Sequence, residues 1–259
     1  MKALILFGST SDQPVYQVLE KKLGQIGVET DLRIISAHRK HKLLAQTLEN
    51  ETFDFVIAGA GLAAHLPGVV ASQVECPVFG IPVKGCLNGL DALLSIVQMP
   101  AGIPVLCGGI DQIEAHILFI ENWNKCDLKS INIVVAAGPE SPVLEKEKER
   151  ILELAKQTNI SFELCHAPQS NGVNIFAIEN EELLNSFLAQ DEILKIGVWL
   201  KNAEQIHHPQ CLDDLIRSTT RGGLWVGINN LRNAYLAGVQ LLGKEGQYQK
   251  TLKEIKQGV

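Results

Sequence analysis

Three short stretches in the first half of the chain hold side chains that bind anions or move protons. The first, Ser9-Thr10-Ser11-Asp12, places hydroxyls and a carboxylate directly after an apolar run. If a helix begins there, its free N–H groups and the hydroxyls can bind an anion, and Asp12 can accept hydrogen bonds from sugar hydroxyls. Ser, Thr and Asp also cap ordinary helices, so capping alone is the alternative explanation.

The second stretch, Ser36-Ala37-His38-Arg39, places a titratable imidazole beside a fixed positive charge. A histidine with an ordinary pKa near ~6.5 exchanges protons at neutral pH. An arginine binds phosphate through two parallel hydrogen bonds. Because Lys40-His41-Lys42 follows, a solvated basic surface loop is the alternative.

The third stretch runs from Ala58 to Ala64, where every residue except Leu62 is glycine or alanine, and His65 follows it directly. Small residues let the backbone approach a ligand closely, and a helix that opens after them points its N–H groups at that ligand. Close packing of a helix on a sheet selects the same small residues. Because His65 emerges directly from this stretch, the sequence favours a ligand site.

Each stretch follows a short apolar run that the sequence predicts to be a buried strand, and each is followed by helical periodicity. The runs are residues 3–7, 30–35 and 53–58, and the helical segments are residues 15–26, 40–48 and 64–72. This alternation predicts a three-layer α/β/α fold of the flavodoxin or Rossmann type, with a parallel sheet between the helices. Ligands bind at the carboxyl ends of such strands, so we expect the three stretches to form one site.

The alternation of strands and helices restarts after the charged stretch at residues 125–129. Gly8 and Gly138 recur at the same spacing as Glu49-Asn50 and Glu179-Asn180. The matching order of elements predicts a tandem duplication, with one domain at residues 1–126 and a degenerate copy at residues 127–259.

Composition excludes several classes of protein. The chain has 259 residues, 46% of them hydrophobic, and a formal net charge of −6, which argues against a dedicated nucleic-acid binder or a polybasic membrane-surface protein. No apolar run reaches the ~18 residues of a transmembrane helix. The six cysteines are scattered without metal-ligand spacing, so we expect reduced thiols in a cytoplasmic protein and no metal site.

Together with Pro82-Val83 and the run at residues 89–105, the three stretches resemble the PurE family of purine biosynthesis over about residues 1–106. They are most similar to its class I type, N5-carboxyaminoimidazole ribonucleotide mutase. The animal-type relatives, which use free CO2 and 5-aminoimidazole ribonucleotide (AIR), carry lysine where Arg39 stands here and have a different third loop.

The resemblance implies an enzyme that moves the carboxylate of N5-carboxyaminoimidazole ribonucleotide to ring carbon C4, without a cofactor or metal. It implies release of CO2 in a closed pocket and its recapture by the ring, with His38 carrying a proton between the nitrogen and C4. The substrate-binding residues that the resemblance implies are Ser9, Ser11 and Arg39 for the 5′-phosphate, Asp12 for the ribose, Ser36 with the backbone of Gly59, Ala60 and Gly61 for the ring and carboxylate, and His65 as a lining residue.

Two departures from the family pattern matter. Leu62 stands where the family usually has glycine, which predicts a tighter pocket. The family's Ile-Asn-Asn-Ala-x-Asn-Ala helix is missing from the first half, and residues 228–234 supply it in the second. Because the second half lacks the catalytic loops, we expect a non-catalytic partner. The family's octamer, in which neighbouring subunits complete each pocket, implies a homo-oligomer here: a tetramer of tandem chains, with the second copy closing the first copy's site.

Two other functions stay open at this point. One is a CO2-dependent AIR carboxylase, which shares the fold and the product. The other is a pseudoenzyme that binds AIR or another nucleotide without turnover, against which the intact set of Asp12, Ser36, His38 and Arg39 argues. A Rossmann dinucleotide enzyme is disfavoured, because no GxGxxG follows the first strand and no acidic residue ends the second.

Overall fold

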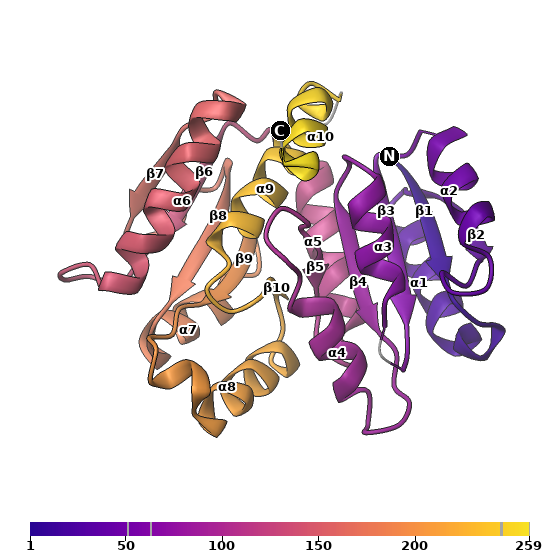
Figure 1. Cartoon of the computed structure of the whole chain (residues 1–259), viewed down its shortest axis with the longest axis horizontal. Helices are drawn as coiled ribbons and strands as arrows, with labels where there is room; N and C mark the ends of the chain where they lie inside the picture. The colour runs from indigo at the N-terminus through magenta and orange to yellow at the C-terminus, as the bar shows by residue number, and fades with distance from the viewer. Residues whose placement is uncertain (51, 63, 244–245, 259) are drawn as a thin grey trace.

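The first strand, β1 (Lys2–Phe7), alternates its apolar side chains between two cores. Ala3, Ile5 and Phe7 pack on one side of the sheet, whereas Leu4 and Leu6 pack on the other. Such a strand needs helices on both faces of its sheet to bury both sets of side chains. The computed structural model, which describes residues 1–50, 52–62, 64–243 and 246–258, has that layered arrangement (Figure 1).

The first half contributes five parallel strands to the sheet. After β1 they are β2 (Glu29–Ile34), β3 (Phe55–Ala60), β4 (Val78–Pro82) and β5 (Leu106–Cys107). The second half contributes another five parallel strands, β6 (Ser130–Val134), β7 (Phe162–Cys165), β8 (Gly172–Ile178), β9 (Leu194–Trp199) and β10 (Leu224–Trp225).

One ten-stranded sheet results, in the order β2-β1-β3-β4-β5-β10-β9-β8-β6-β7. Read from either outer edge, the order within each half is second, first, third, fourth and fifth strand. The halves join through the antiparallel pair β5–β10, with Cys107 opposite Trp225. The predicted α/β fold with a mostly parallel sheet between helices is therefore confirmed.

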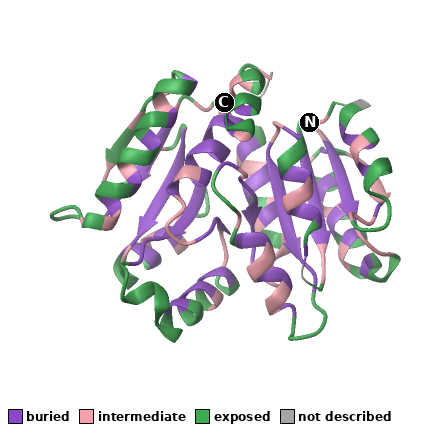
Figure 2. Cartoon of the chain, viewed as in Figure 1, coloured by how far each residue is buried: buried purple, intermediate pink, exposed green. Residues whose placement is uncertain are grey.

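Helices cover both faces of this sheet, and their inner sides are buried while their outer sides are exposed (Figure 2). In the first half they are α1 (Gln13–Gln25), α2 (His41–Asn50), α3 (Leu66–Gln73), α4 (Leu90–Val97) and α5 (Ile113–Lys125). In the second half they are α6 (Pro142–Thr158), α7 (Glu181–Leu188), α8 (Pro209–Thr220), α9 (Leu231–Leu242) and α10 (Gln249–Gln257). No helix among the described residues combines the length and apolar content needed to cross a bilayer.

Helix α9 contains the Asn-rich segment that the sequence places in the second half, and it fastens the halves together. The side chain of Asn230 caps the helix by accepting a hydrogen bond from the Asn233 backbone at 3.2 Å. The Asn233 side chain accepts from the Gly102 backbone at 2.8 Å and donates to the carbonyls of Pro100 and Ile103 at 2.9 and 3.2 Å. The second half thus binds a loop of the first half, residues 98–103.

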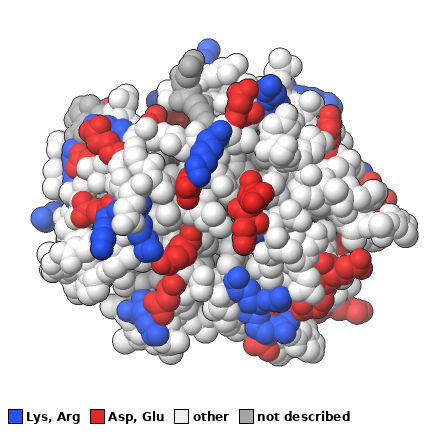
Figure 3. Space-filling model, turned by 180° about the vertical axis from the view of Figure 1, so that it is seen from behind, with Lys and Arg blue, Asp and Glu red and all other residues white. Residues whose placement is uncertain are grey.

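The outer surface has mixed charge on the face shown in Figure 3. There the Lys and Arg side chains are interspersed with Asp and Glu, and no continuous stripe of one sign crosses that face.

Candidate active site

The three polar stretches come together at the carboxyl ends of β1, β2 and β3, where they line one cavity of about 550 Å³. Parallel strands end at the same edge of a sheet, so loops that are far apart in sequence meet there. The cavity is lined by nine of the ten residues that the sequence assigns to catalysis or binding: Ser9, Ser11, Asp12, Ser36, His38, Arg39, Ala60, Gly61 and His65.

The tenth residue, Gly59, lies within β3 and is not among the lining residues. A Cβ atom at this position would lie 2.1 Å from the ring of Phe7 on the neighbouring strand. Glycine at this position, which has no side chain, therefore leaves room for the Phe7 ring in the core.

The first loop is organised by its own hydroxyls. The Ser9 Oγ accepts hydrogen bonds from the Ser11 backbone at 3.2 Å and the Ser11 hydroxyl at 2.7 Å, which caps a short 3₁₀ turn at Thr10–Asp12. Helix α1 begins directly after this turn, with Pro14 in its first turn. Capping and ligand binding are compatible here, because the hydroxyls also line the cavity.

Asp12 is the buried acid of this loop, with only 9% of its surface exposed. Burial raises its pKa above the usual carboxyl range, against the opposing effect of hydrogen bonds from Ser11 and the Ser9 region. The Asp12 Oδ1 lies 3.1 Å from the Ser11 hydroxyl. A carboxylate held here can accept hydrogen bonds from a polar ligand.

His38 and His65, from different loops, form a hydrogen-bonded pair across the cavity. The His38 Nε2 lies 3.1 Å from the His65 Nδ1, and the two rings are nearly perpendicular at 80°. One of these nitrogens must donate and the other must accept, so the contact fixes the position of one proton.

The position of Arg39 beside His38 is set by the turn that contains both. The Arg39 backbone N–H donates to the Ser36 Oγ at 3.4 Å, and the Lys40 N–H donates to the Ser36 carbonyl at 2.9 Å. Arg39 thereby contributes a positive charge to the lining of the cavity.

A fourth loop, after β4, also lines the cavity and was missed by the sequence reasoning. Val83, Lys84 and Gly85 come from this loop, and Lys84 forms an exposed ion pair with Asp111 at 3.4 Å. The position of this loop could have revealed it, because it follows the end of a strand, as the other three loops do.

Leu62 stands at the rim in a strained conformation. Its φ is +45°, which is unusual for a leucine, and its side chain is 65% exposed. Such a conformation costs on the order of 1–3 kcal/mol and is found mostly at functional sites. Leu62 therefore belongs to the lining of the cavity and not to the core.

Within the described part of the chain, every residue that lines this cavity lies between Gly8 and Gly85, so the second half contributes none of its walls. Where residues 61–65 separate β3 from α3, only residues 179–180 separate β8 from α7. Two residues after β9, at the place that Lys84 occupies after β4, stands Lys201. Its ammonium lies 2.6 Å from the Asp214 carboxylate and 4.1 Å from the centre of the Trp199 ring.

Among the described residues, no three His, Cys, Asp or Glu side chains gather as a metal site would require. The cysteines do not enter the cavity lining. Burial raises the pKa of Cys76 to about 12, so this thiol stays protonated at neutral pH.

Comparison with known proteins identifies the first half. A sequence model of the AIR carboxylase family matches residues 2–120. The chain is 51% identical over 118 residues to N5-carboxyaminoimidazole ribonucleotide mutase of Methanocaldococcus jannaschii, which covers 45% of this chain and 75% of that protein. It is also 51% identical over 114 residues to the Pyrococcus abyssi enzyme of the same name, covering 42% of this chain and 66% of that protein.

Among solved structures, Treponema denticola PurE matches with 22% identity and a TM-score of 0.41, covering 60% of this chain and 97% of that chain. The family match ends at residue 120, before the strands of the second half begin. Through residues 2–120, the chain belongs to the AIR carboxylase family.

Proposed function

We propose that the first half of this chain is an N5-carboxyaminoimidazole ribonucleotide mutase of purine biosynthesis. The observation that carries the proposal is the convergence of His38, His65, Arg39 and Asp12 on one cavity of about 550 Å³. That volume is in the range of small-molecule sites, roughly 300–1,000 Å³. The identity to archaeal mutases, about half of the aligned residues, supports the same assignment.

His38 carries the proton in this reaction. When the bond between the substrate nitrogen and its carboxylate breaks, CO2 leaves and the nitrogen takes a proton from the His38 imidazolium. Ring carbon C4 then attacks CO2, and neutral His38 removes the C4 proton as the ring regains its aromaticity. One proton leaves His38 and one returns, so the reaction balances as an isomerisation without an external oxidant, reductant or base.

The other residues bind and orient the ribonucleotide. Arg39, Ser9 and Ser11 supply a positive charge and hydroxyls for the phosphate, and Asp12 accepts hydrogen bonds from the ribose. Ser36 and the backbone of Ala60 and Gly61 face the ring and the migrating carboxylate. Holding CO2 and AIR together in a cavity from which water is excluded favours recapture over loss.

The whole chain is proposed to be a tandem duplication, with a catalytic domain at residues 1–126 and a non-catalytic copy at residues 127–259. The mirrored strand order of the two halves supports this division. Because only first-half residues line the cavity within the described chain, a second copy that closes the site must belong to another chain. We therefore propose a homo-oligomer, a tetramer of tandem chains.

The test is a spectroscopic assay of the purified chain with two substrates in parallel. Rapid conversion of freshly made N5-carboxyaminoimidazole ribonucleotide, with poor use of AIR and bicarbonate, supports the mutase. Efficient use of AIR and CO2 assigns the chain to the CO2-dependent carboxylases instead. Binding of AIR without turnover of either substrate contradicts both and leaves a pseudoenzyme.

A further inference from the structure

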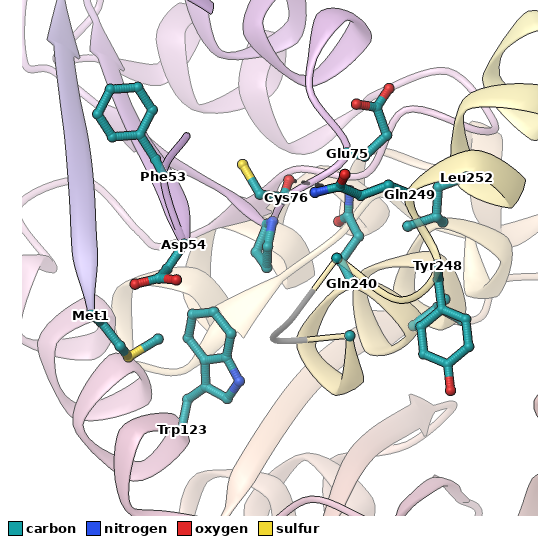
Figure 4. A pocket seen from close by; sticks show the side chains of 14 residues that line it. Met1, Phe53, Asp54, Glu75, Cys76, Trp123, Gln240, Tyr248, Gln249 and Leu252 are labelled. Atoms are coloured by element: carbon teal, nitrogen blue, oxygen red, sulfur yellow. Dashed lines mark hydrogen bonds between the residues drawn. The ribbon is translucent and has the colours of Figure 1, made fainter. Parts of the chain in front are cut away.

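The C-terminal end of the second half packs against the first half on the side opposite the candidate active site. There the loops before β3 and β4 meet the end of α9 and the start of α10 around a small cavity (Figure 4). The Gln240 side chain donates to the Cys76 carbonyl at 3.2 Å across this junction. Helix α10, which follows, lies close to the C-terminal end of α3.

Lys256 on α10 reaches that end of α3. Its ammonium donates to the Ala71 carbonyl at 2.8 Å and also to the Val74 carbonyl. The last carbonyls of a helix have no partners within the helix, and a positive charge beside them is favourable because of the helix dipole. The Lys256 side chain is half-buried and bonds directly to the end of α3, while the nearby Glu75 carboxylate acts on its charge from a longer distance.

The second half also supports the middle of α3, through the loop that carries Met99. A Cβ atom on Gly68 of α3 would lie 2.8 Å from the Cε of Met99, so the Met99 side chain rests directly against the helix backbone. The Met99 carbonyl accepts a hydrogen bond from Asn230 at 2.9 Å. Loop 98–103, which carries Met99, is thus fixed by α9 of the second half.

The other end of α3 carries His65, the residue that caps the helix and pairs with His38 at 3.1 Å. A helix with the eight residues of α3 is about 12 Å long, at 1.5 Å per residue, and moves as one rigid rod. A displacement at Ala71 or Gly68 therefore moves His65 relative to His38.

We infer that Lys256 is a positioning residue, through which the second half of the same chain sets the alignment of His65 with His38. The second half is then an intramolecular support for the catalytic pair, independent of any contact it makes in an oligomer. This inference rests on the proposed function only in that the alignment of the pair sets the rate of proton transfer.

The experiment compares three variants of the full chain with the unaltered protein. Lys256→Met keeps the aliphatic stem and removes the donor, Lys256→Arg restores a donor, and Lys250→Met is a matched control on the same helix with a 92% exposed side chain. Two readouts are recorded: the imidazole NMR signals of His38 and His65 at one fixed pH without ligand, and kcat and KM for the N5-carboxy substrate.

We expect Lys256→Met to move both imidazole signals and to lower kcat about tenfold while KM changes less than about twofold, because misalignment of a reacting group affects turnover more than binding. Lys256→Arg should restore most of both, and Lys250→Met should match the unaltered protein. If Lys256→Met lowers only the thermal stability and leaves the signals and kcat unchanged, Lys256 is a structural residue and the inference is wrong.

If Lys256→Met does not fold, Lys256→Gln replaces it. The shorter neutral side chain weakens the contact with the end of α3, so the same two signals should move, and unchanged signals overturn the inference. The NMR readout needs no turnover. A protein that turns over neither substrate but has Lys256-dependent imidazole signals would therefore contradict the proposed function alone.

Discussion

The two halves of the sheet end in loops at matching places, yet the lysine that lies at an open cavity in the first half has a counterpart in the second half that is buried in an ion pair. In the first half, Lys84 after β4 is exposed at the cavity rim. In the second, Lys201 after β9 is only 8% exposed and is packed between Trp199 and Asp214. The same order of strands therefore supports a site in one half and a closed ion pair in the other. The loops, and not the fold, decide which half can bind a ligand.

Loop length accounts for much of this difference. Residues 61–65 give the first half a small-residue segment that leaves space beside β3, whereas residues 179–180 lead directly into α7. Asn180 caps α7 by accepting from the Leu183 backbone at 2.9 Å. This two-residue connection offers fewer backbone groups to a ligand than the segment at residues 61–65.

The sharpest test of the comparison replaces one histidine in each half, in two separate variants. His38→Asn should lower kcat by about 10³- to 10⁴-fold, the full contribution of a general acid–base group, while AIR still binds. His166→Asn is the matched control, because His166 follows β7 as the second loop follows β2, and its Nδ1 lies 3.3 Å from the Val135 carbonyl oxygen. Steady-state kinetics and equilibrium binding of AIR measure both effects.

Near-normal turnover by His38→Asn would remove the proton carrier from its assigned role. A large loss of kcat in His166→Asn would show instead that the second half takes part in the chemistry, and the contrast between the halves would fail.

Lys201→Met should affect stability rather than activity. The exposed fractions are only 8% for Lys201 and 11% for Asp214, but Asp214 keeps Arg217 at 3.3 Å and Gln210 at 3.0 Å in this variant. The loss of unfolding free energy should therefore be about 1.5–3 kcal/mol, the value of a hydrogen bond to a charged group. Burial alone would raise the pKa of Asp214, but hydrogen bonds from Lys201 and Gln210 outweigh burial and lower it. Urea unfolding at neutral pH measures the loss, with Lys84→Met as the exposed counterpart for stability.

The double variant Lys201→Met with Asp214→Leu should recover most of the lost stability, because it leaves no unpaired buried charge. If Lys201→Met alone is as stable as the unaltered protein, the ion pair between Lys201 and Asp214 does not stabilise the second half.

Arg39→Gln should weaken the substrate's affinity by about 1.5–3 kcal/mol, the usual value of a hydrogen bond to a charged group. KM should rise by at least about tenfold, since 1.4 kcal/mol corresponds to a factor of ten. Gln169→Ala provides the control in the second half, because Gln169 stands in the loop after β7 and carries no charge. Kinetics at varied substrate concentration distinguish the two. If KM is unchanged in Arg39→Gln, the phosphate lies elsewhere in the cavity.

The sequence predicted much of this arrangement because loops after parallel strands must meet at one edge. That rule placed Ser9, His38 and His65 together although they are far apart in the chain, and the cavity contains all three. The role that the resemblance implies for Gly59 stays a prediction, because the structure shows only that this glycine makes room for Phe7 and is not among the lining residues. No local sequence pattern encodes the side-chain packing that brings His38 within 3.1 Å of His65. The same is true of the hydrogen bonds from Lys256 to the end of α3.

The smallest expected effect concerns the stability of the first half and its dependence on pH. Burial raises the pKa of Asp12 in the folded protein above the ordinary value near ~3.9. At pH values between these two pKa values, the folded protein keeps a proton on Asp12 that the unfolded chain has already lost. Stability therefore falls as the pH rises through that window, and the penalty remains in full above it.

Asp12→Asn removes this penalty, because an amide has no charge to bury and its oxygen can still accept from Ser11. The variant should be slightly more stable than the unaltered protein at neutral pH, by less than the loss from Lys201→Met, and the advantage should vanish below the ordinary carboxyl range. Urea unfolding at several pH values measures this, and AIR binding should weaken in the same variant. In the second half, by contrast, Asp214 is paired and its carboxylate stabilises the fold. If Asp12→Asn is less stable than the unaltered protein at neutral pH, the Asp12 carboxylate stabilises the fold, as the Asp214 carboxylate does.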